Sequence, residues 1–369
     1  MSKAPRVSLQ QFLAYCVQHS LPVAFYRLPG TRAVKVVAQH NSKLLKVNLS
    51  RHAQQPGFLF APFTPTTTAH SVLIRPDIYC TAASLPRLTF APTVQTKFSA
   101  LVPKLKSTGR SQYQGLVKSI KQFIASGKAR KVIAARVLTM PRPEGFNEVK
   151  LFTALCSAYA HAFVSLVYTP QYGMWVGASP EVLLTGANNR FTTYSLAGTK
   201  ANTAANLKTG WGDKEKEEQA IVSRYIGQSV ARVTKQPPVV KGPVTATAGN
   251  LLHLLTTFTY NNVPADKWPQ LVKALHPTPA VAGLPQRAAI QFITSAEPNP
   301  RSFYSGYLGP VNLDGRINLF VNLRCMQVFK NKLAIYVGCG ITADSEPAKE
   351  WNETGIKSQT LLNVIAGIK

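Results

Sequence analysis

The chain has 369 residues, of which 45% are hydrophobic and 9% aromatic, enough for one large domain or two moderate ones with a sizeable core. It carries 42 Lys and Arg but only 15 Asp and Glu, a formal net charge of +27. No apolar run approaches the roughly 20 residues that span a membrane, and the N-terminus lacks the apolar stretch of a signal peptide. We therefore expect a cytoplasmic protein without a membrane partner.

The five cysteines are scattered and odd in number, and none forms a CxxC pair. This pattern argues for reduced thiols and against a zinc site or a disulfide framework. The basic residues are equally dispersed, without a block of five or six and without an aromatic-interleaved basic motif. We therefore expect no specific nucleic-acid partner, although a positive field attracts a small anionic substrate.

The sequence predicts short strands and loops in the first part of the chain, followed by alternating helices and strands. Residues 1–104 alternate short apolar runs with Pro/Thr-rich turns, which are typical of short strands and loops. A boundary follows at 103–115, and apolar residues at helical spacing predict a helix that ends near Gly127. Next in order, the sequence predicts a strand at 131–140, a helix at about 148–160, and strands at 162–169 and 173–179.

The second part predicts a long helix that begins with an acidic cluster and runs to about Lys235. Two strands follow, RINLFVNLRCMQVF (316–329) and KLAIYVG (332–338), joined by a tight turn at Lys330–Asn331. A closing helix is expected from about Ser345 to Ile365. Hairpin-like strand pairs interspersed with helices favour an α+β fold with large antiparallel sheets and flanking helices.

Eight of the 15 acidic residues lie in two short segments, each in the N-terminal part of a predicted helix: Asp213, Glu215, Glu217 and Glu218, and Asp344, Glu346, Glu350 and Glu353. The helix macrodipole favours carboxylates there, which accounts for Asp213, Asp344 and Glu346. Glu350 and Glu353, three positions apart, share one face of the helix. Two such carboxylates with a third from another helix suit a hard cation such as Mg²⁺, which prefers oxygen ligands.

Ten motifs between residues 110 and 369 resemble, in order, those of the chorismate-utilising enzymes, and are most similar to isochorismate synthases. They are KVIAAR (131–136), GASPEVLL (177–184), SLAGTK (195–200), KEKEEQAIV (214–222), LLHLLT (251–256), LHPTPAVAGLP (275–285), RSFYSGYLG (301–309), FVNLRC (320–325), GCGIT (338–342) and EWNETGIK (350–357). The resemblance implies that water is added at C2 of chorismate and the C4 hydroxyl is lost, with Mg²⁺ bound.

By this resemblance, Lys131 is the base that takes a proton from water, for which it must be neutral. Glu181 is the acid that protonates the leaving hydroxyl, which requires a raised pKa. Without the resemblance, we would interpret Lys131 as an ordinary basic residue at the start of a strand, and Glu181 as a solvated carboxylate. The resemblance further implies Glu218, Glu350 and Glu353 as metal ligands, with Glu215 beside them.

The family's substrate-binding positions correspond to Ala197, Gly198, Thr199, His253, Tyr304, Arg324, Gly338, Gly340 and Lys357. Arg324 suits a carboxylate because its guanidinium forms a bidentate fork. Gly338 and Gly340 allow the backbone to approach the substrate. His253 also fits a buried structural histidine, and that alternative stays open.

Three features separate the reactions of the family. Ala197 stands where aminodeoxychorismate synthases have a nucleophilic Lys, so water remains the nucleophile. Lys131 fills a base position that ammonia-using relatives fill differently. His276 and Thr278 in LHPTPAVAG are similar to isochorismate synthases, whereas salicylate and anthranilate synthases have Phe-Pro-type sequences there. Two departures are Gln219, where the family usually has His, and Cys339, where Ala is common.

The expected architecture is a single domain over residues 1–369, in which 1–104 packs on a catalytic part at 110–369. The expected function is Mg²⁺-dependent conversion of chorismate to isochorismate, for menaquinone or siderophore biosynthesis. Relatives in this branch are often monomers, so we expect a monomer rather than an obligate oligomer. The alternatives are a salicylate synthase, which also eliminates pyruvate, and a basic nucleic-acid-binding relative that has lost catalysis.

Overall fold

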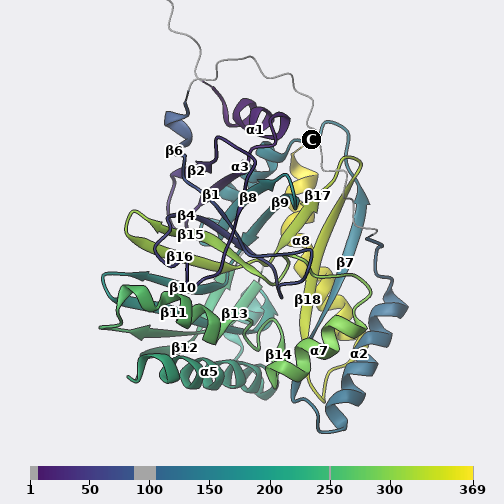
Figure 1. Ribbon diagram of the computed structural model, residues 1–369. Coiled ribbons are helices and arrows are strands. Elements are labelled where there is room, and N and C mark those ends of the chain that lie inside the picture. The colour runs from purple at the N-terminus through teal and green to yellow at the C-terminus, as the bar shows by residue number, and fades with distance from the viewer. Residues whose placement is uncertain (1–6, 87–104, 249–250, 369) are drawn as a thin grey trace, which may run out of the picture.

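Two nine-stranded antiparallel sheets, with helices on their outer faces, make up the part of the chain that the computed structural model describes, residues 7–86, 105–248 and 251–368 (Figure 1). Apolar side chains of both sheets, among them Phe60, Phe163 and Trp175, pack together between them. The α+β class with large antiparallel sheets and flanking helices is confirmed.

Each sheet combines strands from distant parts of the sequence. In spatial order, sheet A consists of β14 (Gly283–Leu284), β7 (Lys131–Pro141), β18 (Lys332–Ile341), β17 (Cys325–Val328), β9 (Gly173–Ser179), β8 (Phe163–Thr169), β1 (Val23–Arg27), β2 (Val34–Ala38) and β6 (Ile78–Thr81). Sheet B consists of β12 (Val239–Ala248), β13 (Leu251–Tyr260), β11 (Arg190–Ala201), β10 (Val182–Ala187), β16 (Arg316–Val321), β15 (Tyr307–Leu313), β4 (Gly57–Ala61), β5 (Val72–Ile74) and β3 (Leu45–Lys46). The N-terminal strands therefore extend one end of both sheets.

Helices cover the outer faces in three groups. Those that share a core with sheet A are α1 (Leu9–Gln18), α3 (Glu148–Ala158) and α8 (Pro347–Gly367). At the β7–β18 end lie α2 (Arg110–Ala125) and α7 (Gln286–Ala296), and on sheet B lie α5 (Asp213–Thr234) and α6 (Trp268–Leu275). The short helices are η1 (Ala82–Ser84), α4 (Ala204–Lys208) and η2 (Ala265–Lys267). Within the described ranges, no helix has the length and apolar character that crossing a membrane requires.

Most predicted elements are present, including the long helix α5, the closing helix α8 and the turn between β17 and β18. The prediction that the N-terminal region contains strands and loops alone was wrong, because α1 lies there. A capping box starts this helix: the Ser8 side chain accepts a hydrogen bond from the backbone N–H of Gln11, and the Gln11 side chain accepts one from that of Ser8.

The expected continuous strand at 316–329 was also wrong, because the chain changes sheets within it. β16 ends at Val321 in sheet B and β17 begins at Cys325 in sheet A. Asn322 holds the crossing: its backbone N–H donates to the Gly306 carbonyl and its side chain to that of Phe303, both at 2.8–2.9 Å. Both strands are buried, so the apolar run continues through the break and conceals it.

A second crossing lies beside the first. The chain leaves sheet A after Ser179 at the end of β9 and enters sheet B at Val182, through Pro180 and Glu181. The two crossings are hydrogen-bonded, because the backbone N–H of Val321 donates to the Glu181 carbonyl at 3.0 Å and the Ser179 hydroxyl donates to the Val321 carbonyl. These crossings place residues from both sheets around one cavity.

Candidate active site

A cavity with about 750 Å³ of empty space, including its mouth, is lined by both sheets, both crossings and helices α5 and α8. Thirteen of the residues predicted from the sequence line it: Lys131, Glu181, Ala197, Gly198, Thr199, Glu218, His253, Tyr304, Arg324, Gly338, Gly340, Glu353 and Lys357. Two other predicted residues, Glu215 and Glu350, are not among the lining residues. Positions up to 226 residues apart in the sequence thus meet at one site.

Lys131 opens β7, where it is 2% exposed and pairs with Leu284 of β14. Its side chain lies against Gly340 of the neighbouring strand β18. A Cβ atom at position 340 would be 2.6 Å from Lys131 Cε, closer than real Cβ contacts. The glycine therefore makes room for the lysine, a role more specific than the backbone approach expected from the sequence.

Gly338 does the same for Tyr304. Positions 338 and 340 point to the same face of β18 because side chains alternate along a strand. A Cβ at Gly338 would lie 2.9 Å from the Tyr304 hydroxyl oxygen. Tyr304 is buried, and its ring stacks on Tyr336 at a centroid distance of 5.5 Å. The two glycines thus accommodate the Lys131 side chain and the Tyr304 hydroxyl on one wall.

Glu181 lies at the crossing from β9 to β10 and is 5% exposed. Burial raises its pKa to about 7, although the positive charges of Lys131, Arg324 and Lys357 oppose the shift. A carboxyl group with this pKa is partly protonated near neutral pH and can donate a proton. The structure therefore excludes the alternative of a solvated carboxylate.

Arg324 lies at the other crossing, with a left-handed backbone φ of 49°. Burial lowers its pKa, while Tyr304 and Glu353 oppose that effect. One guanidinium nitrogen, Nη1, is 3.4 Å from the Lys357 carbonyl oxygen. A cationic fork on the cavity wall can bind a carboxylate of a small anion.

Helix α8 places three charged side chains against β18. The Lys357 ammonium is 2.6 Å from Glu353 Oε1 and donates to the Gly338 carbonyl at 3.0 Å. Ligand atoms of Glu350, Glu353 and Cys339 all lie within 4.8 Å of one another, and Glu350 is 1% exposed. Glu350 thus supports this cluster from behind the cavity wall.

The arrangement of carboxylates fits a divalent cation. The carboxylates of Glu350 and Glu353 converge as one helical face predicts, and Glu218 of α5 lines the same cavity as Glu353. These oxygens are the donors that Mg²⁺ prefers. The Cys339 thiol is a softer donor, and it already contacts the Tyr113 hydroxyl at 3.0 Å. The other predicted acid of α5, Glu215, lies over Gly198, where a Cβ would be 3.1 Å from Glu215 Cβ.

His253 faces the cavity with a defined tautomer. Its Nδ1 is 2.8 Å from the Gly198 carbonyl oxygen, which accepts, so Nδ1 donates and Nε2 has the free lone pair. Thr199 Oγ1 is 3.3 Å from the same nitrogen. Burial, and next the charge of Arg324, lower the pKa of His253 to about 3, so the ring is neutral. Both a structural and a substrate-binding role agree with this geometry.

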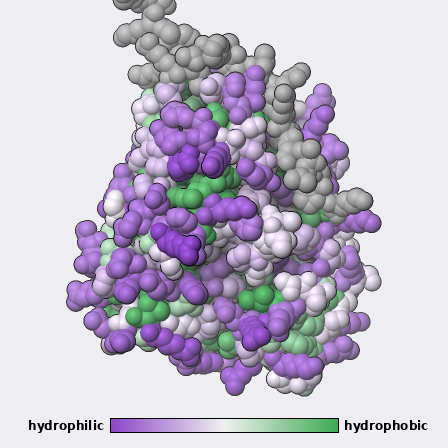
Figure 2. All heavy atoms as spheres, in the orientation of Figure 1, coloured by the Kyte–Doolittle hydropathy of each residue, from purple (hydrophilic) through white to green (hydrophobic). Residues whose placement is uncertain are grey.

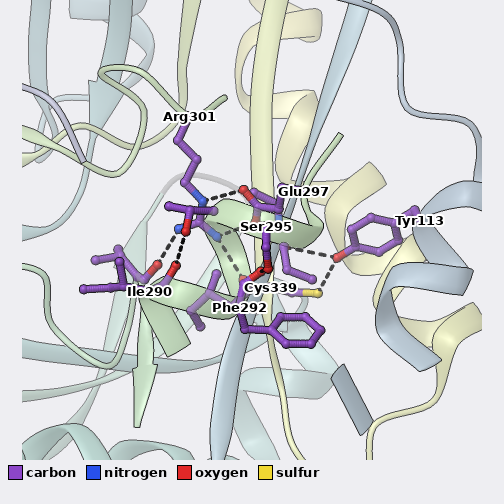
Figure 3. Close-up of polar contacts among 12 residues, drawn as sticks. Tyr113, Ile290, Phe292, Ser295, Glu297, Arg301 and Cys339 are labelled. Carbon is purple, nitrogen blue, oxygen red and sulfur yellow. Dashed lines mark hydrogen bonds and ion pairs between the residues drawn. The ribbon is translucent and has the colours of Figure 1, made fainter. Parts of the chain in front are cut away.

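A buried ion pair braces the strand that carries Lys131 (Figure 3). The Arg301 guanidinium donates to both Glu297 oxygens at 2.6–2.8 Å, and also to the Ile133 carbonyl at 2.9 Å. Glu297 Oε1 accepts the backbone N–H of Ala135 at 2.9 Å. The pair therefore binds two alternate backbone positions of β7 and fixes the strand just after Lys131.

Several cavity residues had no predicted role. Ser305, beside Tyr304, is buried and lines the cavity. Apolar walls come from Leu196, Ala280, Val281 and Leu323. The segment at 275–285 was informative as a motif, yet Ala280 and Val281 line the cavity whereas His276 and Thr278 do not. His276 instead contacts the Phe63 carbonyl at 3.1 Å through Nε2.

Comparisons with known proteins identify the family of the chain. Residues 57–366 match the family model described as "Chorismate binding enzyme". Isochorismate synthase EntC of Escherichia coli is 26% identical over 289 residues, 76% of this chain and 73% of that protein. The vibriobactin-specific isochorismate synthase of Vibrio cholerae is 26% identical over 323 residues, 85% of this chain and 79% of that protein.

The fold is shared with solved structures. The menaquinone-specific isochorismate synthase MenF of Escherichia coli has a TM-score of 0.78 at 22% identity, covering 98% of this chain and 92% of that one. Anthranilate synthase component I of Streptococcus pneumoniae has a TM-score of 0.67 at 16% identity, covering 98% of this chain and 100% of that one. Because the family model matches most of its length, the chain belongs to the chorismate-binding enzymes.

Proposed function

We propose that the protein converts chorismate to isochorismate, with Mg²⁺ as cofactor. The observation that carries the proposal is one cavity lined by the buried Lys131, a carboxyl group of raised pKa and Arg324, with the carboxylates of Glu218 and Glu353 on its wall and Glu350 close behind Glu353. The relatives named as isochorismate synthases support the same reaction.

In the proposed reaction, Lys131 takes a proton from a water molecule as it adds to C2 of the ring. Glu181 gives its proton to the hydroxyl group that leaves C4, so one water is consumed and one released. A lysine base and a protonated glutamate are each matched to one proton transfer. Ala197 lies on the cavity wall where a lysine would offer a competing nucleophile, so water remains the attacking group.

Carboxylate recognition falls to Arg324, Tyr304 and Lys357. The substrate has two carboxylates, and the guanidinium, phenol and ammonium groups that line the cavity supply donors for both. Lys357 still has donor capacity after pairing with Glu353 and Gly338, because an ammonium has three hydrogens. The His253 Nε2 lone pair can accept a hydrogen bond from a substrate hydroxyl.

The cation would be held by Glu218, Glu350 and Glu353, and when bound it offsets the negative charge of the substrate's ring carboxylate. Lys357 keeps the Glu353 carboxylate oriented against β18 through its 2.6 Å ion pair. The relatives include a vibriobactin-specific and a menaquinone-specific enzyme, so we propose one of these two kinds of pathway for the product.

The test is to incubate the purified protein with chorismate, with and without Mg²⁺, and to separate the products by chromatography. The proposal predicts isochorismate in the presence of Mg²⁺ and none after chelation. Salicylate with pyruvate would identify a salicylate synthase instead. No turnover under either condition would contradict the enzymatic proposal and favour the binding-protein alternative.

A further inference from the structure

A second cavity lies between helix α5 and the edge strand β12, which run along the base of the molecule in Figure 1. It has a volume of about 560 Å³, and it shares no lining residue with the catalytic cavity. Small-molecule sites typically have volumes of about 300–1000 Å³. This α5–β12 groove is therefore large enough for a ligand of its own.

One face of α5 forms the wall of the groove. Lys216, Gln219, Ala220 and Ser223 all line it, at the spacing i, i+3, i+4 and i+7 that defines a helical face. Glu218, one position before Gln219, lines the catalytic cavity instead. The same helix thus faces the two cavities with different sides.

Two buried polar atoms on this wall have hydrogen-bonding capacity to spare. Gln219 is 2% exposed, and its Nε2 donates to the Ser195 carbonyl at 3.0 Å and to Thr256 Oγ1 at 2.9 Å. Its Oε1, and Oγ of Ser223, have no partner among the described residues. A buried acceptor without a donor costs free energy, which a ligand with an O–H or N–H group would recover.

The opposite wall is apolar and partly open to solvent. Val240, Pro243, Leu254 and Phe258 line the groove together with Trp211. Among the lining residues, Val240 is 51% exposed, and Val239 and Val244 of the same strand, β12, are 51% and 55% exposed. Figure 2 shows an apolar patch in this region, at the lower left of a mainly hydrophilic face. Exposed apolar surface rimmed by polar groups is typical of a binding site.

The charged residues of the lining are both cations, Lys216 and Arg224. Their acidic partners Asp213 and Glu217 do not line the groove, and these exposed pairs contribute little energy. A second copy of the chain is a poor occupant, because two proteins of charge +27 repel each other. The charge, the apolar wall and the spare acceptor select a small apolar anion that carries a donor.

We propose that the α5–β12 groove binds a small aromatic carboxylic acid that bears a hydroxyl or amino group. The ring packs between Trp211 and Phe258, the carboxylate lies near Lys216 and Arg224, and the donor meets Gln219 Oε1. Because α5 also carries Glu218, a ligand in the groove can affect the catalytic cavity through this helix. Only this effect on catalysis rests on the proposed function.

The experiment is isothermal titration calorimetry of the full chain with 4-hydroxybenzoate, without chorismate or metal. Ala220→Trp fills the groove and is expected to weaken binding at least about tenfold, while Ala231→Trp, on an exposed part of the same helix, is expected to bind like wild type. The double variant Lys216→Glu/Arg224→Glu changes exposed side chains, so its fold is safe, and it is also expected to weaken binding about tenfold.

An aromatic acid could instead enter the catalytic cavity, so Arg324→Ala serves as the matched test. The proposal predicts that Arg324→Ala retains binding and that benzoate, which lacks the donor, binds more weakly. Loss of binding in Arg324→Ala with full binding in Ala220→Trp would overturn the proposal, as would the absence of any heat with wild type. Neither result depends on whether chorismate is converted.

Discussion

The two acidic helices look alike in sequence but differ in what their carboxylates do. On α8, Glu350 is 1% exposed and Glu353 is paired with Lys357 against β18. On α5, Asp213 and Glu217 point to solvent and pair with exposed cations, and Glu218 alone among the four acids lines the cavity. Burial and the neighbouring strand, rather than the number of acids, give a carboxylate its role.

The largest effect is expected at Glu181, a buried carboxyl group that lies outside both helices. Glu181→Gln keeps the shape but cannot donate a proton, and we expect kcat to fall on the order of a thousandfold. Steady-state kinetics of purified wild type and variant at pH 7 would measure it. A fall of less than about tenfold would mean that another group protonates the leaving hydroxyl.

The Glu181→Gln substitution should also change how the free energy of unfolding depends on pH, and this can be measured without substrate. The folded-state pKa of Glu181, about 7, lies above its ordinary value of 4.5, so the folded protein binds the proton more tightly. Its stabilising contribution is present at low pH and is lost as pH rises from about 4.5 through 7. Relative to wild type, Glu181→Gln should gain on the order of 3 kcal/mol of unfolding free energy between pH 4.5 and 8.

Denaturant unfolding of both proteins across this pH range is the measurement. A difference in unfolding free energy that does not change with pH would show that the carboxyl group keeps its ordinary pKa in the folded state.

The substitution Glu353→Gln tests whether the carboxylates on α8 hold the metal. This change weakens the oxygen cluster on α8 and leaves the Lys357 ammonium without its 2.6 Å partner. We expect the Mg²⁺ concentration for half-maximal rate to rise on the order of a hundredfold. Rates measured over a range of Mg²⁺ would check it, and an unchanged requirement would remove Glu353 from the metal site.

Gly340→Ala tests the space that α8 and β18 leave for the base. The new methyl group would lie 2.6 Å from Lys131 Cε, so the lysine must move. We expect kcat to fall about tenfold or more, because small displacements of a catalytic group are costly. Circular dichroism would confirm the fold, and a fully active, folded variant would show that the position of Lys131 is not critical.

The smallest effect is expected from Glu217→Gln on α5. This side chain is 61% exposed and pairs with Arg224 on the surface, a kind of pair that contributes little. We expect kcat and the Mg²⁺ requirement to stay within about twofold of wild type. A large loss of activity here would break the contrast between the two helices.

Most residues of this site were predicted from the resemblance to the family, and local patterns alone predicted a smaller part. The spacing of Glu350 and Glu353 placed both on one helical face, and the run at 131–140 gave the strand that begins with Lys131. The crossing at Asn322 could not be predicted, because buried strands on both sides share one apolar pattern. The burial of Glu181 and the fit of Gly340 to Lys131 depend on contacts between distant strands, which periodicity does not encode.

Isotope labelling can show whether water attacks C2 and whether Lys131 is its base. Chorismate is converted in H₂¹⁸O and the isochorismate is examined by mass spectrometry. The account predicts one ¹⁸O atom in the C2 hydroxyl of the product, formed by wild type and lost with the activity in Lys131→Ala. Unlabelled isochorismate would contradict water addition, and labelled product at the wild-type rate from Lys131→Ala would contradict the base.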